Sequence, residues 1–309
     1  MKDVTIILVN YKTKDITINA IKSILKETKD INYEIILVDN NSNDGIIEEV
    51  NKLFPEIITI RSDKNLGFAG GCNLGSEYSK GKYLLFLNTD TILIGNTIKE
   101  MYEFMENHID YGVIGTLLID QKNNIIQSWG NFLPFNVGIK EFLIRPFLPK
   151  ALKNNSRKEN IKEFERKFFK DREAIEVDYI IGADMFVRKD IFEKIGKFDE
   201  RFFMYFEEAD LQIRIKKKGY KIGIVKCTPI IHLESISFTS SNKKRTMKMV
   251  SFLKYLRKNF PIYYIIFKPF SLVYGITKLL ADLLLKEYTF RENLTFIKSL
   301  YHETFDFVK

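Results

Sequence analysis

The chain of 309 residues is poor in cysteine, tryptophan and histidine, with two Cys, one Trp and three His. The two cysteines, Cys72 and Cys227, are too few for a disulfide framework. The first residues lead directly into a strand pattern and lack the charged and apolar regions of a signal peptide. We therefore expect a reducing, cytoplasmic location.

Two further patterns are missing. The most apolar late stretch, Ile262 to Leu285, is interrupted by Lys268, Lys278 and Asp282, whereas a membrane-spanning helix needs about 20 consecutive apolar residues. This stretch is therefore expected to lie on a membrane at most. The dinucleotide fingerprint G-x-G-x-x-G is also absent after the first predicted strand, so we do not expect a nicotinamide enzyme.

The composition is that of a folded protein, because 45% of the residues are hydrophobic and 14% are aromatic. The formal net charge of +8 favours an anionic partner, such as nucleic acid, an anionic membrane face or a phosphorylated substrate. No RNA- or DNA-binding motif accompanies the charge, so we do not expect nucleic-acid binding.

Strand and helix patterns alternate through the first part of the chain. Apolar strand patterns occupy 4–9, 34–38, 57–60 and 83–87, and helical patterns occupy 15–28, 44–53, 70–79 and 96–107. This alternation predicts an α/β fold with a mainly parallel central sheet and helices on both faces. Mixed strands follow at 112–119, 125–129 and 177–181, and the charged segment 150–176 is expected to form a mobile loop or a solvated helix over the site.

Polar residues follow the first three predicted strands. Asn10 and Tyr11 end the first strand, and Asp39 and Asn41 end the second, where open α/β sheets bind ligands. Asp39 is suited to accept hydrogen bonds from a base or a ribose, although an N-cap role explains it equally well. The glycine-rich segment 65–75 is expected to be a loop whose N–H groups face a phosphate or ribose, and ordinary turn chemistry is the alternative.

Two later positions have the chemistry of a cation site. Asp90 ends the segment Asn88-Thr89-Asp90 after a very apolar strand, and a hard divalent cation prefers such oxygen ligands. His232 is suited to complete a mixed oxygen and nitrogen shell of the kind that Mn²⁺ accepts. The alternatives are a turn stabilised by Asn and Asp side chains and a buried structural histidine.

A second acidic cluster, Glu207-Glu208-Ala209-Asp210, begins a helical pattern after the apolar run Phe202 to Phe206. Acids at a helix N-terminus are favoured by the helix dipole, which explains one of them. Three acids beside an apolar run instead indicate a partly desolvated carboxylate with a raised proton affinity. One of the three is a candidate general base.

Taken together and in order, these segments resemble the inverting family 2 glycosyltransferases of the GT-A fold, particularly the rhamnosyltransferase-like members that build bacterial and archaeal surface glycans. The resemblance covers roughly Val4 to Ser237. The motifs that carry it are Val9-Asn10-Tyr11, Val38 to Ser42, Asn65 to Asn73, Leu87 to Asp90, Gly182-Ala183 with Arg188, Gly196 to Glu200 and Phe203 to Arg214.

The resemblance implies a dTDP- or UDP-linked nucleotide-sugar donor, with rhamnose as the expected sugar, a glycan or polyprenol-linked acceptor, and Mn²⁺ or Mg²⁺ as cofactor. It implies that Asp90 and His232 bind the cation and that Glu208 is the catalytic base. The residues expected to bind the nucleotide-sugar are Asn10, Tyr11, Asp39, Asn41, Asn65, Gly67, Phe68, Ala69, Asn73 and Asn88.

The sequence departs from the family pattern at two positions. Glu208 stands where the family base is commonly Asp, so Glu207 and Asp210 remain alternative bases. Asn88 replaces the first acid of the DxD motif, so looser cation binding is expected. These departures also leave open a catalytically silent module that binds a nucleotide-sugar or a glycan without turnover.

We expect a catalytic domain over residues 1–240 and a basic, aromatic helical appendage over 241–309. Its lysines and arginines lie beside a dense aromatic run, a mixture that favours a peripheral position on the inner, anionic face of the cell membrane. A solvated helical subdomain or a dimer contact is the alternative.

Overall fold

The computed structural model describes residues 2–133, 164–170, 172–233, 241–269 and 298. These residues divide into two compact units. The first comprises the described residues of 2–132, 164–201 and 207–233, and the second includes Phe202–Phe206 together with the residues from 241 onward. Each unit is described by itself.

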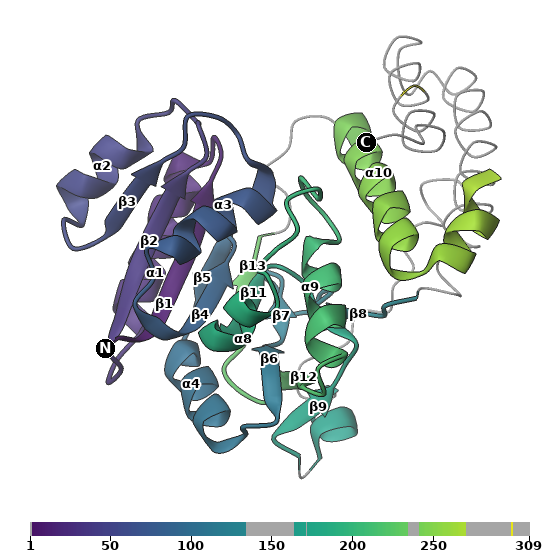
Figure 1. Ribbon diagram of the computed structural model, residues 1–309. Helices are drawn as coiled ribbons and strands as arrows, with labels where there is room; N and C mark the ends of the chain where they lie inside the picture. The colour runs from purple at the N-terminus through teal and green to yellow at the C-terminus, as the bar shows by residue number, and fades with distance from the viewer. Residues whose placement is uncertain (1, 134–163, 171, 234–240, 270–297, 299–309) are drawn as a thin grey trace. The chain divides into compact units, whose positions relative to one another are not determined.

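The first unit is built on a sheet of eight strands in the order β3-β2-β1-β4-β11-β6-β12-β9 (Figure 1). Strands β1, β2, β3 and β4 are mutually parallel, β11 is antiparallel to both of its neighbours, and β12 is parallel to β6. The strands of this sheet are β1 (Lys2–Asn10), β2 (Tyr33–Asp39), β3 (Ile58–Arg61), β4 (Gly81–Leu87), β6 (Tyr111–Gly115), β9 (Ala174–Glu176), β11 (Asp184–Arg188) and β12 (Lys221–Val225).

Two small sheets and several helices complete this unit. The small sheets pair β8 (Trp129–Gly130) with β10 (Tyr179–Ile180), and β13 (Ile230–His232) with β5 (Thr91–Leu93) and β7 (Leu118–Ile119). The helices are α1 (Lys14–Glu27), α2 (Ile46–Leu53), α3 (Gly67–Glu77), α4 (Thr97–Asn107), α8 (Lys189–Lys194), α9 (Glu207–Lys216) and the short π-helix η3 (Glu165–Phe169).

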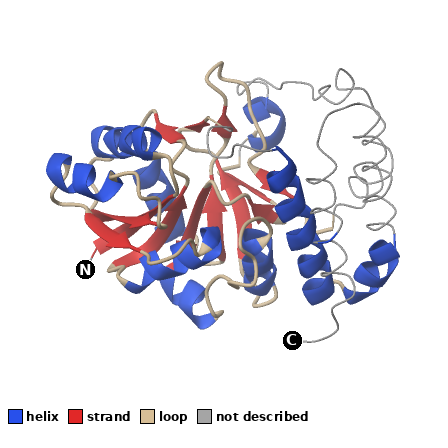
Figure 2. Ribbon diagram, turned by 90° about the horizontal axis from the view of Figure 1, so that it is seen from above, coloured by secondary structure: helices blue, strands red, loops and turns tan. Residues whose placement is uncertain are grey.

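Both faces of the central sheet are buried, as the apolar strand patterns predict. Successive residues of a strand point to opposite faces, so Ile6 and Leu8 of β1 belong to one hydrophobic cluster and Ile7 belongs to the other. Helices α1, α2 and α4 cover the first face, and α3, α8 and α9 cover the second. Figure 2 shows the strands of this unit as a layer with helices on both sides. The predicted α/β class with a mostly parallel sheet is confirmed.

The structure differs from the sequence expectations at two places. The glycine-rich segment is mainly helix, because α3 already begins at Gly67. The segment 112–119 is split into β6 and β7, and Ile125 contributes an isolated bridge to Ile119. Most of the expected mobile segment 150–176 lies outside the described residues.

The second unit contains the non-helical segment Phe202–Phe206 and, from residue 241 onward, described residues that are helical. Helix α10 (Ser241–Asn259) is followed by helical residues at 261–269. The aromatic ring of Phe206 packs against Phe252 and Tyr255 at centroid separations of 5.3 and 5.2 Å, which ties the 202–206 segment to α10. Among the described helices, none combines the length and the hydropathy that crossing a bilayer requires.

Candidate functional site

The carboxyl ends of β1 and β2 lie side by side, because Asn10 pairs with Asp39 in the parallel register. Asp39 is buried; its Oδ1 accepts the N–H of Ser42 at 3.0 Å, and its Oδ2 lies 3.6 Å from Arg61 Nε. Asn10 is fully buried, donates to Ser42 Oγ at 2.8 Å and accepts from the hydroxyls of Thr13 and Thr17. The side-chain nitrogen and oxygen of Asn10 therefore hold the loops that follow β2 and β1, respectively.

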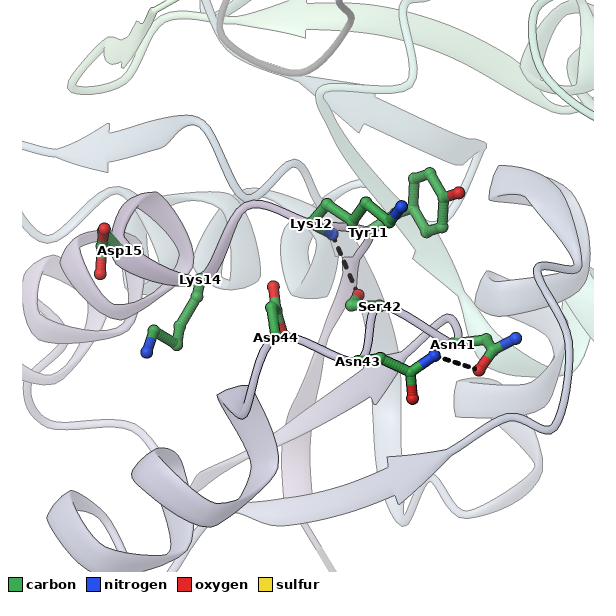
Figure 3. A pocket seen from close by; sticks show the side chains of 8 residues that line it. All are labelled: Tyr11, Lys12, Lys14, Asp15, Asn41, Ser42, Asn43 and Asp44. Carbon is green, nitrogen blue, oxygen red and sulfur yellow. Dashed lines mark hydrogen bonds between the residues drawn. The ribbon is translucent and has the colours of Figure 1, made fainter.

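These loops frame an open pocket of about 780 Å³ at the same sheet edge (Figure 3). Two of the predicted nucleotide-sugar residues, Tyr11 and Asn41, line it. The other lining residues are Lys12, Lys14, Asp15, Ser42, Asn43 and Asp44. Asn41 holds a left-handed backbone, with φ of 60°, and accepts a hydrogen bond from Asn43 at 3.2 Å. The pocket thus combines an aromatic ring, amides, two lysines and two aspartates at the sheet edge where β2 ends in Asp39.

The N-terminus of α3 is held by an asparagine that the candidate residues did not include. Asn40 is buried; its Nδ2 donates to Asn65 Oδ1 at 3.0 Å and to the Gly67 carbonyl at 2.9 Å, and its Oδ1 accepts the Leu66 N–H at 2.8 Å. The Asn65 side chain also accepts the Gly67 N–H at 2.9 Å. Asn40 directly follows Asp39, so its position in the strand-end motif is the signal that would have identified it.

The glycines of α3 allow the helix to pack tightly on the sheet. A Cβ at Gly71 would lie 2.6 Å from Val9 Cγ1, and one at Gly75 would lie 2.7 Å from Ile7 Cγ2. Ala69 is fully buried in the same layer, whereas Phe68 is half-buried. The glycine-rich pattern therefore has a packing cause at these two positions, and the expected contact of its N–H groups with a phosphate or ribose stays a prediction.

Asn73 of α3 also contacts protein groups. It is buried, donates to the Phe198 carbonyl at 3.0 Å and to Glu200 Oε1 at 2.9 Å, and accepts the Phe198 N–H at 3.1 Å. It thereby holds the loop at Gly196 to Glu200 against α3. Asn10 and Asn73 thus position neighbouring segments, and the expected donor contacts of Asn10, Ala69 and Asn73 stay predictions.

The candidate cation ligands come together at the end of β4. Asp90 Oδ1 lies 3.2 Å from His232 Nε2, and each side chain is 11% exposed. Their strands explain the proximity, because Thr91 of β5 pairs with His232 of β13. Thr89 Oγ1 lies 3.3 Å from Thr13 Oγ1, which connects this segment to the loop that carries Tyr11 and Lys12.

A buried acid that the sequence analysis missed lies on the other side of this segment. Asp184 begins β11, opposite Leu87 of β4, and is fully buried. Its Oδ2 accepts the Thr116 N–H at 2.7 Å. Burial raises the pKa of Asp184 to about 7, against the lowering effects of the Thr116 hydrogen bond and of His232. Asp184 stands at the start of a strand that also ends in a charged residue, Arg188, so the sequence pattern offered no signal that would have identified it.

The three acids of α9 have different surroundings. Asp210 is fully buried and its Oδ2 lies 3.0 Å from Arg214 Nε, while Arg214 also donates to the carbonyls of Ile195 and Lys197. Glu207 is 4% exposed, and burial, followed by the charge of Glu208, raises its pKa well above the usual value. Glu208 alone among the three is partly accessible to solvent. Asp210 therefore forms an ion pair with Arg214, and the side chain of Glu207 is buried from solvent.

Glu208 lies beside the start of β11. Its Cβ is 3.9 Å from the position that a Cβ on Gly182 would take, and the next residue, Ala183, accepts the N–H of Asn88 at 2.9 Å. Burial, then the negative charge of Glu208, raises the pKa of Tyr179. The 182–184 segment therefore joins Glu208 on one side to the Asn88–Asp90 segment on the other.

The donor set at the end of β4 fits a divalent cation of the kind expected from the sequence. A carboxylate, an imidazole and the nearby amide of Asn88 are hard or borderline donors, and oxygens of a diphosphate and water would supply the remaining positions. Within the described residues, no group of three or more His, Cys, Asp and Glu side chains converges on one point. Asp90 and His232 form a pair, so a cation here depends on substrate oxygens.

Comparison with known proteins gives a consistent result. The model of the family described as glycosyl transferase family 2 matches residues 5–196. A low-salt glycan biosynthesis hexosyltransferase of Haloferax volcanii is 25% identical over 243 residues, which are 77% of this chain and 70% of the relative. An N-acetylglucosaminyl-diphospho-decaprenol L-rhamnosyltransferase of Mycobacterium tuberculosis is 24% identical over 210 residues, 64% of this chain and 66% of the relative.

Two solved structures share the fold. The mannosyltransferase PcManGT of Pyrobaculum calidifontis, in complex with GDP-Man and Mn²⁺, aligns with a TM-score of 0.58 and 12% identity over 100% of this chain and 90% of its own. GalNAc-T7 with UDP, GalNAc and Mn²⁺ aligns with a TM-score of 0.60 and 15% identity over 83% of this chain and 48% of its own. At these identities the similarity shows the GT-A fold alone.

Proposed function

Because the chain belongs to glycosyl transferase family 2, we propose that it transfers a sugar from a nucleoside-diphosphate donor to a hydroxyl group of a glycan or lipid-linked acceptor, with inversion at the anomeric carbon. The observation that carries this proposal is the adjacency described above: Glu208 lies beside Gly182, and Ala183 bonds to Asn88 at the start of the Asp90 segment. A candidate base and a candidate cation ligand therefore belong to segments that are joined at one sheet edge.

We propose a donor that carries dTDP or UDP, with rhamnose as the first sugar to test. One relative is named as a rhamnosyltransferase, and another, from Escherichia coli, is named as a UDP-Glc-dependent glucosyltransferase that acts on a diphosphoundecaprenol-linked sugar. The pocket lined by Tyr11 and Asn41 is the proposed place of the nucleoside, with Asp39 below it and Lys12 near the phosphates. The acceptor is proposed to be a glycan or a polyprenol-linked sugar.

Glu208 is the proposed general base. Its carboxylate removes the proton from the acceptor hydroxyl as the oxygen attacks the anomeric carbon, and attack opposite the leaving group produces inversion. The neighbouring Glu207 is buried, and its burial and the charge of Glu208 raise its pKa, so Glu208 is the carboxyl group of this pair that remains partly accessible to an acceptor. Asp210 keeps α9 in place through Arg214.

Asp90 and His232 are the proposed protein ligands of a divalent cation, with Asn88 beside them. When bound, Mn²⁺ or Mg²⁺ would neutralise the charge that develops on the departing diphosphate. Other polar groups at this edge of the sheet have structural roles that need no cation. The Thr13–Thr89 contact of 3.3 Å holds the loop that carries Lys12, and the hydrogen bonds of Asn40 hold the N-terminus of α3.

The substitution Glu208→Gln tests the base. We expect release of nucleoside diphosphate in the presence of donor and acceptor to fall by about 10²–10⁴-fold, with little change in thermal stability or donor binding. Glu208→Asp, which restores the residue common in the family, should retain activity, and the exposed Glu193→Gln serves as a neutral control. Unchanged transfer by Glu208→Gln would show that the base is another residue.

The same assay separates the enzyme from a silent binding module. A panel of nucleotide-sugars is first screened for thermal stabilisation with and without Mn²⁺ or Mg²⁺, because a ligand that binds the native state raises its stability. The stabilising donors are then incubated with glycan and polyprenol-linked acceptors. Binding without any release of nucleoside diphosphate would favour the silent module over the transferase.

We also propose that the residues from 241 onward form an appendage that attaches to an anionic membrane surface. The side chains of Ile262, Ile265 and Ile266 are 71%, 69% and 50% exposed, and basic residues of α10 precede them. An apolar face next to basic residues is typical of interfacial helices. Cosedimentation with anionic vesicles should fall in Ile262→Ser and Ile266→Ser but not in Ile109→Ser, a control at an 81% exposed position in the first unit. Equal cosedimentation of all the variants would contradict the proposal.

A further inference from the structure

The two residues that precede α9 have an unusual backbone. Tyr205 and Phe206 both have positive φ, of 71° and 68°, and residues with bulky side chains rarely adopt this left-handed region. Such residues persist where surrounding contacts hold them in place. Helix α9 begins at the next residue, Glu207, and Glu208 lies in its first turn. The left-handed pair therefore sets the direction in which the chain enters the helix that carries the proposed base.

Helix α10 holds this segment at two points. Ser251 is buried, and its Oγ donates to the main-chain carbonyl of Met204 at 2.7 Å. The ring of Phe206 packs against the rings of Phe252 and Tyr255, at centroid separations of 5.3 and 5.2 Å. The first contact lies immediately before the left-handed pair, and the second is made by the last residue of the pair. Both contacts belong to the second unit.

The contacting residues of α10 share one side of the helix and are shielded from solvent. Ser251 and Tyr255 are four residues apart, a spacing that places both on one face of a helix, and Phe252 and Tyr255 are buried. The start of the segment is held as well, because Phe202 is buried and Lys258 Nζ lies 5.9 Å from the centroid of its ring. Buried contacts of this kind hold a backbone in a conformation that its residues do not favour by themselves.

We propose that three residues of α10 are positioning residues for Glu208, because they hold the left-handed pair that fixes the first turn of α9. They are Ser251, Phe252 and Tyr255. Without these contacts, positions 205 and 206 return to ordinary φ values, and the Glu208 side chain moves from its place beside Gly182. The inference rests on the proposed function, since it takes Glu208 as the base, and it gives the second unit a role in the transfer step that is separate from membrane attachment.

Two substitutions weaken the two contacts separately. Ser251→Ala removes the hydrogen bond to Met204, and Phe252→Leu keeps an apolar side chain but removes the ring. The first readout is hydrogen exchange of the full chain without ligands, followed by mass spectrometry. We expect the amides of residues 206–216 to exchange about 5–10-fold faster in both variants, because the start of α9 opens more often. The amides of α1 should exchange as in the wild-type protein.

The second readout separates positioning from a loss of folded protein. Transfer is measured per donor-binding site, counted by isothermal titration, with dTDP-rhamnose and N-acetylglucosaminyl-diphospho-decaprenol as the first donor and acceptor. The rate should fall by about 10–10²-fold in Ser251→Ala and Phe252→Leu at unchanged donor affinity, because a displacement of about 1 Å costs this much. In Glu208→Gln, which has no base left to position, adding Ser251→Ala should change the residual rate by less than about twofold.

Ser79→Ala is the matched control for Ser251→Ala. Ser79 is also buried and its Oγ also donates to a main-chain carbonyl, that of Ser76, at 2.6 Å, but it lies in the first unit. This substitution removes the same kind of hydrogen bond without touching the 202–206 segment. It should change neither the exchange of α9 nor the transfer rate per donor-binding site.

Exchange of α9 at the wild-type rate in both variants would overturn the proposal. An equal loss of rate on adding Ser251→Ala to the wild-type protein and to Glu208→Gln would also overturn it, because the effect would then not act through Glu208. Failure of the proposed function is distinguishable: unchanged transfer by Glu208→Gln rejects that residue as the base, whereas the exchange measurement needs no substrate and still decides whether α10 holds the start of α9.

Discussion

Replacing Gly71 by alanine tests whether the glycine-rich segment serves packing or phosphate binding. The new Cβ would lie 2.6 Å from Val9 Cγ1, 3.2 Å from Cγ2 and 3.5 Å from Cβ, whereas carbon atoms in contact are normally about 3.5–4.0 Å apart. Helix α3 or Val9 must therefore move by about 1 Å. Overpacking of this kind costs about 1–3 kcal/mol, and the better helix propensity of alanine returns up to about 1 kcal/mol. We expect a net destabilisation of about 1–2 kcal/mol.

The cause is identified by a double-mutant cycle with Val9→Ala, which removes the two methyl groups that the new Cβ would meet. Adding Val9→Ala to Gly71→Ala should recover about 1 kcal/mol or more relative to the sum of the single changes. The control pair is Gly75→Ala with Val9→Ala, because a Cβ at Gly75 meets Ile7 and Val38 and not Val9. That cycle should be additive.

Stability is measured by urea denaturation, and donor affinity is measured by thermal shift with the donor found in the panel. The packing explanation predicts a lower midpoint for Gly71→Ala and unchanged affinity of the folded protein. An additive Gly71–Val9 cycle, accompanied by a large loss of donor affinity at unchanged stability, would refute it and restore the phosphate-binding interpretation.

Two further predictions concern the acids of α9. Asp210→Asn should lower the free energy of unfolding by about 3–5 kcal/mol, because it leaves Arg214 without its buried carboxylate. The control Glu193→Gln breaks an exposed pair with Lys189 and should change the free energy of unfolding, measured by urea denaturation, by less than about 0.5 kcal/mol. Equal effects of the two substitutions would contradict the structural role of Asp210. The second prediction concerns Glu207, whose raised pKa means that above about pH 4.5 the folded state binds more protons than the unfolded state. The free energy of unfolding of the wild-type protein, relative to that of Glu207→Gln, should therefore fall as pH rises, by up to about 1.4 kcal/mol per pH unit. The difference is measured by urea denaturation across pH 4.5–8, and a flat difference for Glu207→Gln would disprove the assignment.

Several features of the fold were accessible from local pattern. The apolar strands at 4–9, 34–38 and 83–87, separated by amphipathic helices, require crossover connections and hence parallel pairing. The α3 segment was less accessible, because glycine-rich loops and glycine-rich helices share a composition. The difference is decided by Val9 and Ile7, whose side chains lie against the helix.

In the candidate site, residue type was also predictable from the sequence, whereas the contacts of each residue were not. Asp90 and His232 were selected one by one for their chemistry, and the β5–β13 pairing brings them within 3.2 Å. Asn10 and Asn73 were selected by motif, but both are occupied by protein hydrogen bonds. Asp184 was missed because a single acid in a strand has no periodic signature.

The sequence by itself determined the alternation of strands and helices, the acidic clusters and the family motifs, because periodicity and residue type are local properties. The tertiary structure decided which acid remains accessible: Asp210 is neutralised by Arg214, Glu207 is buried, and Glu208 faces the edge beside Gly182. Burial and partners depend on residues that are distant in the chain, so the local sequence pattern does not determine them.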